Sequence, residues 1–236
     1  MTPAALLDAL WRDYTALTPQ AARVHALFTA RGEVIVNDHV ALRTFARPGI
    51  DRFTLGRRFE ALGWVKADDY RFDDKHLWAS YWRHPDRDLP KVFISELVLD
   101  ELPPAIAAVL DGLVAALPAG FATRPELPYA GRPWAIDHGT YQRLLAVSEY
   151  AAWVAAFGFR VNHFTVDVGR LRSFADLPAV NAFLAAEGFE LNRAGGLIKG
   201  TPADHLEQSS TCAEPIAVEG TDGRFAVPSC YYEFAR

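Results

Sequence analysis

Apolar residues at the start of the chain recur at helical spacing. Leu6, Leu10 and Tyr14 lie four positions apart, so they share one side of a helix. The pattern predicts an amphipathic helix over residues 3–17. A second helix is expected over 19–31, where the chain reaches a glycine.

Two later stretches, 37–45 and 160–168, alternate in polarity instead. Because successive side chains of a strand point to opposite faces, His39 and Arg43 share one face of the first stretch. In the second stretch, His163 lies on the polar face, opposite a run of Phe and Val side chains. A single His in a strand is usually structural, but two in matched positions are able to converge on one metal ion or one substrate.

The same order of elements, a helix and then strands, follows each of these stretches. In the first half, Asp51 is the expected N-cap of a helix to about residue 62, and strands are predicted within 64–84 and over 91–99. In the second half, Asp176 opens the corresponding helix. The predicted elements around it are a helix over 140–157, short strands at 189–191, 197–199 and 204–211, a tight turn at 221–223 and a last strand that reaches Phe234.

This internal repetition predicts an α+β fold in which two βαβββ-type repeats form a half-open barrel around one cavity, with added helices. The repeats cover about 33–100 and 159–236. Helices precede them over 1–32, and a helical connector joins them over 101–158. We expect residues 1–236 to form a single metal-binding domain.

The composition narrows the classes of function. The 236 residues carry a net charge of −5 and no basic run, which disfavours nucleic-acid binding. No apolar stretch is long enough to span a membrane, and the N-terminus lacks the features of a signal peptide. The cysteines, Cys212 and Cys230, have no metal-type spacing, so a cytoplasmic protein without a disulfide is expected. A homo-oligomer is compatible with this composition.

Each repeat also closes with a strand that carries a glutamate, Glu96 in the first and Glu233 in the second. Two His and one carboxylate form the facial triad of non-haem Fe(II) oxygenases, and the same donors suit Zn or Mn. His39, His163 and Glu233 are the candidate metal ligands. Glu96 is the spare carboxylate, and its position among aliphatic side chains requires a partner.

Segments spread over nearly the whole chain resemble the DUF1338 family of the vicinal oxygen chelate, or glyoxalase-like, superfamily. Within that family the chain is similar to the 2-oxoadipate dioxygenases/decarboxylases, also called 2-hydroxyglutarate synthases. The matching segments are Asn37–Phe45, Phe93–Leu102, Val161–Val168, Leu206–Thr211 and Tyr231–Phe234.

The resemblance implies a half-open barrel that binds Fe(II) through His39, His163 and Glu233. It also implies that Arg43 binds the carboxylate of the substrate. The implied reaction converts a 2-oxo acid such as 2-oxoadipate and O2 into a 2-hydroxy acid and CO2, without an organic cofactor. Zn, Ni or Mn are able to occupy the same site in the isolated protein. Longer members carry an additional C-terminal portion, so the metal chemistry transfers to this chain more directly than the substrate does.

Three further residues are candidates for contact with the substrate. Gln208 and Ser209 lie on a predicted strand of the second repeat, where they are placed to hydrogen-bond a substrate or a ligand. Tyr231 shares the face of the carboxylate ligand and is expected to line the cavity. His76 and His205, on the middle strands of the two repeats, are expected to be exposed or structural.

Two other functions fit the same residues. One is a glyoxalase-type lyase or isomerase that uses Zn or Ni. The other is a non-catalytic ligand-binding protein of the same superfamily. Metal analysis and oxygen consumption together separate these functions from the dioxygenase.

Overall fold

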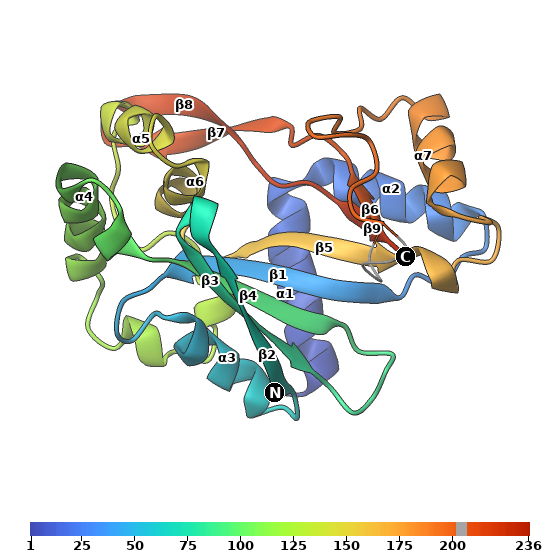
Figure 1. The fold of residues 1–236 in the computed structure, drawn as a ribbon, viewed down its shortest axis with the longest axis horizontal. Helices are drawn as coiled ribbons and strands as arrows, with labels where there is room; N and C mark the ends of the chain where they lie inside the picture. Colours follow the sequence, from blue (N-terminus) through green and yellow to red (C-terminus); the bar gives the residue numbers. More distant parts are fainter. Residues whose placement is uncertain (202–206) are drawn as a thin grey trace.

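The computed structural model describes residues 1–201 and 207–236. In this part of the chain, seven strands form one open sheet in the order β2-β3-β4-β1-β5-β9-β6, and β7 and β8 form a separate hairpin (Figure 1). This mixed sheet with added helices confirms the predicted α+β class and half-open barrel. The strands are β1 (Asn37–Phe45), β2 (Val65–Phe72), β3 (Leu77–Arg83), β4 (Lys91–Leu97), β5 (Val161–Asp167), β6 (Gln208–Ser210), β7 (Pro215–Gly220), β8 (Gly223–Pro228) and β9 (Glu233–Ala235).

The first half is a complete βαβββ unit. From β1 the chain passes through helix α3 (Arg52–Glu60) to β2, β3 and β4, and β4 returns to pair with β1 in parallel. In the second half, β5 pairs in parallel with β9, which pairs antiparallel with β6. The halves meet where β1 and β5 pair antiparallel, so one sheet runs through both.

The second half is abbreviated relative to the predicted repeat. Residues 189–191 and 197–199, expected as strands, contribute only isolated bridges. The expected strand over 204–211 is described only in its later part, because His205 and its neighbours lie outside the described residues. The expected last strand divides at 229–232, between the end of β8 and the start of β9.

The helices follow the predicted periodicity closely. The side chains of Asp51 and Asp176 cap α3 and α7, each accepting a backbone hydrogen bond at 2.8 Å. The helix expected over 140–157 is two helices, because Ser148 caps a new N-terminus by accepting a hydrogen bond from the Ala151 amide. No helix in the described ranges is long and apolar enough to cross a membrane. The helices are α1 (Pro3–Leu17), α2 (Pro19–Ala30), α3 (Arg52–Glu60), α4 (Pro104–Ala115), α5 (His138–Leu145), α6 (Glu149–Phe157) and α7 (Leu177–Ala186).

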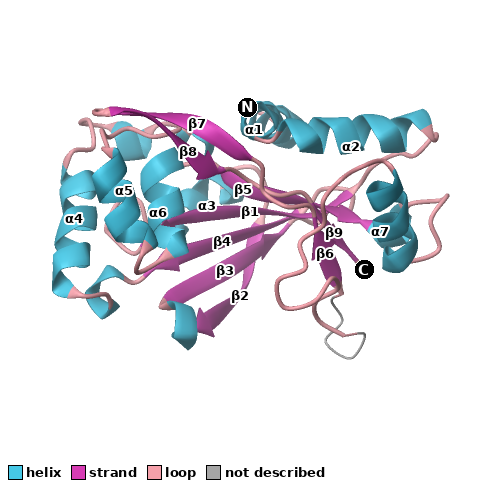
Figure 2. Cartoon of the chain, turned by 90° about the horizontal axis from the view of Figure 1, so that it is seen from above, coloured by secondary structure: helices cyan, strands magenta, loops and turns pink. Residues whose placement is uncertain are grey.

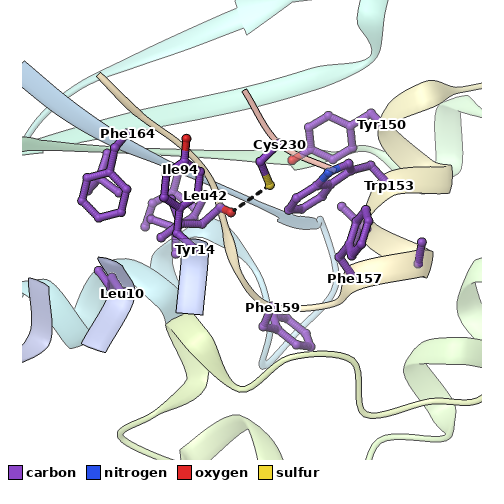
Figure 3. Close-up of a cluster of buried hydrophobic side chains, with 14 of the residues drawn as sticks. Leu10, Tyr14, Leu42, Ile94, Tyr150, Trp153, Phe157, Phe159, Phe164 and Cys230 are labelled. Carbon is purple, nitrogen blue, oxygen red and sulfur yellow. Dashed lines mark hydrogen bonds between the residues drawn. The ribbon is translucent and has the colours of Figure 1, made fainter. Parts of the chain in front are cut away.

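Helix α1 packs on the apolar face of the sheet, opposite the His side chains. The rings of Trp11 and Tyr14 lie 5.1 and 5.2 Å from the ring of Phe164 on β5. Leu42 of β1 and Ile94 of β4 are buried in the same core (Figure 3). Figure 2 shows α1 and α2 on this same side of the sheet. The apolar faces of the central strands are therefore covered, which leaves the opposite face for a site.

Helix α3 approaches the sheet closely because it contains a glycine. A Cβ atom at Gly56 would overlap the indole ring of Trp82 on β3. The Trp82 indole nitrogen in turn donates a hydrogen bond to the Glu60 carboxylate at 2.8 Å. Any larger residue at position 56 would push α3 away from β3.

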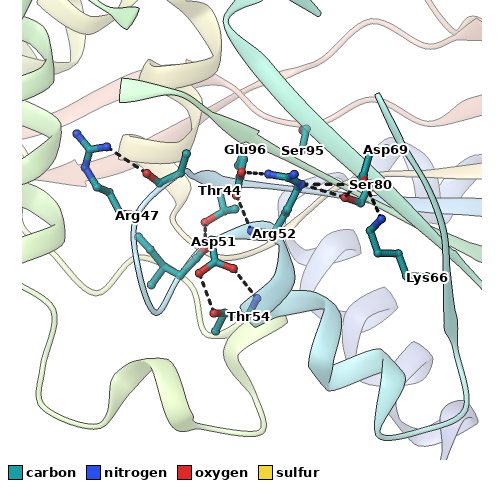
Figure 4. A network of polar contacts seen from close by, with 12 residues as sticks. Thr44, Arg47, Asp51, Arg52, Thr54, Lys66, Asp69, Ser80, Ser95 and Glu96 are labelled. Carbon is teal, nitrogen blue, oxygen red and sulfur yellow. Dashed lines mark hydrogen bonds and ion pairs between the residues drawn. The ribbon is translucent and has the colours of Figure 1, made fainter. Parts of the chain in front are cut away.

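The spare carboxylate, Glu96, is buried on this helix-covered side and is only 4% exposed. Its oxygens form an ion pair with the Arg52 guanidinium and accept a hydrogen bond from the Arg52 amide at 2.7 Å. The Arg52 Nε–H group donates a hydrogen bond to the Ser80 hydroxyl at 2.9 Å, and this hydroxyl donates one to the Asp69 carboxylate (Figure 4). Burial raises the pKa of Glu96, and the charge and hydrogen bonds of Arg52 oppose that rise. Glu96 therefore has the partner that its buried position requires.

We predict that Arg52→Met lowers the free energy of unfolding by about 3 kcal/mol, because it leaves the Glu96 carboxylate buried without a cation. Urea unfolding at neutral pH measures the change. Arg23→Met is the matched control, since the Arg23–Glu214 pair has side chains that are 61% and 48% exposed and its loss should cost less than about 1 kcal/mol. Equal losses in the two variants would contradict the role given to Arg52.

Candidate metal centre and substrate site

Three side chains from three neighbouring strands converge on one point. In the described ranges, His39, His163 and Glu233 form the one group of at least three His, Cys, Asp or Glu whose donor atoms lie within 4.8 Å of one another. The Glu233 Oε2 atom is 3.7 Å from His39 Nε2 and 3.3 Å from His163 Nε2. The structure thus brings together the residues that the sequence named as candidate ligands.

The strand register explains this convergence. His39 of β1 is opposite Thr165 of β5, and Ala41 is opposite His163. Thr165 is in turn opposite Glu233 of β9. The donors therefore project from the same face of adjacent strands. Ala41 keeps the space between His39 and Arg43 free of a large side chain.

Each imidazole is oriented by the residue that precedes it. His39 Nδ1 lies 2.8 Å from the Asp38 carboxylate, and His163 Nδ1 lies 2.9 Å from the Asn162 side-chain oxygen. Both partners are acceptors, so each Nδ1 carries the hydrogen and each Nε2 presents a lone pair. Metal-binding histidines use their second nitrogen in this way.

The donor set fits a divalent cation. Thr165 has one hydroxyl hydrogen, and its oxygen is 3.0 Å from His39 Nε2 and 3.2 Å from the Glu233 carboxylate. That hydrogen is able to serve only one of the two acceptors. Two imidazole lone pairs and a carboxylate oxygen then face one another, an arrangement that a bound cation stabilises.

Burial shapes the charge states at this point. Burial, followed by the nearby charges of His39 and Arg43, holds the pKa of His163 well below its ordinary value, so its imidazole is neutral at physiological pH. Burial raises the pKa of Glu233, and His39 and Thr165 oppose that rise. Burial would also raise the pKa of Asp38, but hydrogen bonds from His39 and Lys91 lower it to about 2. A neutral imidazole is the form that binds metals.

Arg43 is held over two aromatic rings near the cluster. Its guanidinium carbon lies 5.0 Å from the centre of the Tyr150 ring and 5.3 Å from that of Trp153, both on α6. It forms no ion pair with a carboxylate of the described residues. A half-buried guanidinium without a carboxylate partner is suited to bind an anionic ligand.

Tyr231 also lies at the cluster, as the sequence predicted. Its ring stacks on the His163 ring, with centres 4.9 Å apart and planes inclined by 24°. Burial raises the pKa of Tyr231 to about 12, against the opposing charge of Arg43. The phenol is therefore neutral at physiological pH. The stacked Tyr231 ring also limits the movement of the His163 ring.

The irregular segment 229–232 delivers Tyr231 and Glu233 to the site. Its four consecutive carbonyl oxygens accept hydrogen bonds from four different parts of the chain. In order, the donors are the Trp153 indole at 2.7 Å, the Gln20 amide at 3.1 Å, the Tyr14 hydroxyl at 2.6 Å and the Thr211 backbone N–H at 3.0 Å. The sequence predicted that Trp153, Gln20 and Tyr14 lie in helices, but it did not predict these hydrogen bonds. A helical pattern does not show that a polar atom reaches across the core.

The two remaining substrate candidates lie on opposite faces of β6. Ser210 pairs with Glu233, so Ser210 and Gln208 share the face of the cluster. Ser209 projects to the other face, where its hydroxyl donates a hydrogen bond to Asn181 of α7 at 2.7 Å. The structure thus separates Ser209 from the ligands.

His76 does not lie on a middle strand, contrary to the expectation from the sequence, because β3 begins only at Leu77. Its side chain is 45% exposed, in agreement with the expected exposed or structural role. It lies in the turn between β2 and β3 and contacts the Glu101 carboxylate at 3.0 Å. His205 is outside the described residues, so its expected role stays a prediction.

A cavity of about 600 Å³ opens at the end of the sheet beside Asp38, and none of the three candidate ligands lines it. Asp38 and Lys91 line it, so the carboxylate that orients His39 also faces this cavity. Arg83, Arg87 and Arg170 contribute positive charge to the walls. In a chain of net charge −5, this local excess of cations favours the approach of an anion.

Comparison with known proteins supports the resemblance seen in the sequence. The family model for 2-oxoadipate dioxygenase/decarboxylase matches residues 5–115 and 131–236. A curated Arabidopsis thaliana protein, "2-oxoadipate dioxygenase/decarboxylase, chloroplastic", is 33% identical over 219 residues, which are 84% of this chain and 57% of that protein. The chain therefore spans little more than half the length of this relative.

Solved structures agree in fold. A Shewanella frigidimarina protein, provisionally described as a hydrolase, has a TM-score of 0.96 and 46% identity, with 99% of this chain and 92% of that chain covered. Hydroxyglutarate synthase from Oryza sativa, in complex with 2-oxoadipate, has a TM-score of 0.91 and 30% identity, with coverages of 98% and 79%. A Ralstonia eutropha protein provisionally assigned to the glyoxalase superfamily has a TM-score of 0.83 at 20% identity, with coverages of 99% and 82%, and supports the fold alone.

Two buried tyrosines allow a test of how segment 229–232 is held. We predict that Tyr14→Phe lowers the free energy of unfolding by about 1–2 kcal/mol, because it leaves the Tyr231 carbonyl without its donor. Tyr232→Phe is the control, since the Tyr232 hydroxyl is buried without a partner among the described residues. Chemical denaturation should find this second variant at least as stable as the parent. A larger loss in Tyr232→Phe than in Tyr14→Phe would show that the hydrogen bond does not anchor the segment.

Proposed function

Because the chain belongs to the 2-oxoadipate dioxygenase/decarboxylase family, we propose that it converts a 2-oxo dicarboxylic acid and O2 into a 2-hydroxy acid one carbon shorter and CO2. The proposed substrate is 2-oxoadipate or a close homologue, and the proposed metal is Fe(II). The observation that carries the proposal is the convergence of two imidazoles and one carboxylate beside an arginine that has no carboxylate partner in the described ranges. The Oryza sativa relative was crystallised with 2-oxoadipate.

His39, His163 and Glu233 would hold the metal on one side and leave its other positions to exogenous ligands. Iron bound there supplies two-point chelation of the 2-oxo acid and the electron transfer that O2 requires. Asp38 and Asn162 keep both imidazoles in the metal-binding tautomer by accepting their Nδ1 hydrogens. The cluster is therefore organised before a substrate arrives.

Arg43 binds a carboxylate of the substrate in this proposal. Its planar guanidinium offers two parallel N–H donors to a carboxylate, and the Tyr150 and Trp153 rings hold it from one side. The same rings exclude water, which strengthens the charge interaction. Tyr231 closes the His163 side of the site with its ring.

A metal-dependent lyase or isomerase is the principal alternative, because the glyoxalase-like fold and the donor set also suit Zn or Ni. Oxygen consumption decides between them. We expect the iron-loaded protein to consume one O2 for each CO2 released with a 2-oxo diacid of five to seven carbons. Release of CO2, or isomerisation of an added substrate, without O2 uptake would contradict the dioxygenase. The cytoplasmic location and the oligomeric state stay predictions, and the Arabidopsis relative is named as chloroplastic.

For the metal, we predict that His163→Ala abolishes stoichiometric binding of a divalent ion while the circular dichroism spectrum is retained. The imidazole is a ligand in this proposal, and its removal leaves two donors. Glu96→Gln is the control, because Glu96 is paired with Arg52 away from the cluster. Titration calorimetry with Ni(II), and with Fe(II) under anaerobic conditions, measures both. Undiminished binding in His163→Ala would exclude this ligand set.

For the substrate, we predict that Arg43→Lys retains the metal but lowers kcat/KM for a 2-oxo diacid by the equivalent of about 2–4 kcal/mol, since Lys lacks the two-point geometry. If Arg43 holds the distal carboxylate, a 2-oxo monoacid of similar length should lose less. An equal loss with both substrates would mean that Arg43 orients the carboxylate next to the keto group. Unchanged kinetics with both would remove Arg43 from the substrate site.

A further inference from the structure

The two halves of the sheet place different residues at equivalent positions. In the second half, the residue two after His163 is Thr165, and it is opposite Glu233 on the parallel strand β9. In the first half, the residue two after His39 is Ala41, and it is opposite Phe93 on the parallel strand β4. Phe93 is therefore the counterpart of Glu233 in the first half.

Glu96 is not that counterpart, although it lies on the same strand as Phe93. It is opposite Thr44 and is three residues from Phe93, so it projects from the other face of β4. There the Glu96 carboxylate forms an ion pair with Arg52 and accepts a hydrogen bond from its amide, so it is not available to a metal ion. Two symmetric halves would supply four ligands, but here the fourth position carries a hydrocarbon ring.

Phe93 borders an aromatic surface that extends away from the cluster. It is opposite Tyr81 of β3, and the Tyr70 ring lies 6.2 Å from Phe93 and 5.9 Å from Tyr81. On its other side is Ala41, which is 5% exposed and too small to fill the space between Phe93 and His163. Phe93 is half-buried, and its ring offers no lone pair that a metal ion binds strongly.

We propose that Phe93 occupies the position of a fourth metal ligand and keeps it free of protein donors, so that the ion is open toward β4 to an exogenous molecule with two vicinal oxygens. On an octahedral ion such as Fe(II) or Ni(II), three protein ligands leave more positions open to exogenous ligands than four would, and the additional position is the one on the side of β4. The open side faces the aromatic surface of β3 and β4. That the exogenous molecule is a 2-oxo acid rests on the proposed function, but the position of Phe93 relative to the metal does not.

The direct test converts Phe93 into a ligand. Phe93→Glu should bind Ni(II) or Zn(II) at least about tenfold more tightly than the parent in titration calorimetry, because a fourth anionic donor joins the site. Phe93→Gln controls for the loss of the ring. Tyr81→Glu controls for the added charge, since it lies on the same face one strand further from the cluster. Tightening in Phe93→Glu that Tyr81→Glu reproduces would overturn the proposal, because charge alone would account for it.

A rescue experiment uses the symmetry of the two halves. Glu233→Gln should weaken metal binding, and Phe93→Glu combined with Glu233→Gln should restore it to within about tenfold of the parent, because the mirror position then supplies the carboxylate. Thermal unfolding without metal verifies that each variant is folded. A folded double variant that binds no better than Glu233→Gln would show that position 93 does not reach the ion.

Oxalate provides a readout that does not depend on turnover, because it presents two vicinal oxygens and does not react as a 2-oxo acid. Oxalate should bind the Ni(II)-loaded parent and bind Phe93→Glu at least about tenfold more weakly, because the added carboxylate takes one of the open positions and repels the dianion at short range. The effect should be smaller in Tyr81→Glu, whose carboxylate is farther from the ion. Equal weakening in both would overturn the proposal. Failure of the parent to consume O2 with 2-oxo diacids would reject the proposed function and leave these metal and oxalate results unaffected.

Discussion

The antiparallel pairing of β1 with β5 is the interaction on which the site depends. This ladder is the junction between the two halves of the sheet, and its register sets His39 beside Thr165 and Ala41 beside His163. A shift by one residue would turn one imidazole to the face that α1 covers. Phe164 resists such a shift, because its ring is buried against Trp11 and Tyr14. The packing of Phe164 on one face of the sheet thus holds the two histidines in position on the other face.

The candidate carboxylate ligand, Glu233, is positioned in a different way. Strand β9 has only three residues and follows an irregular segment, so a ladder of so few bonds is a weak constraint on its register. Hydrogen bonds from Tyr14, Gln20 and Trp153 to the carbonyls of this segment supply the missing constraint. Trp153 also lies against Arg43. One indole therefore links the placement of Glu233 to that of the cationic side chain.

Periodicity and caps were sufficient to predict most elements from the sequence, including β1, α1 and the N-cap Asp51. The site residues on long, regular strands, such as His39 and His163, were predictable because side chains alternate between the two faces there. Alternation did not fix the phase of the short strand β6, where Ser209 projects toward Asn181. It also did not identify Gln20, because a helical pattern shows which side is apolar and not which distant carbonyl a side chain reaches. These contacts depend on tertiary packing.

The difference between the halves has a physical basis in where each glutamate is buried. Glu96 projects to the helix-covered face, where Arg52 from the neighbouring helix neutralises it permanently. Glu233 projects to the opposite face, where burial raises its pKa and the nearby donors are two imidazoles. A carboxylate that is buried without a permanent cation is stabilised by one that binds. The first half therefore uses its glutamate for folding, and the second half leaves its glutamate free to bind the proposed metal ion.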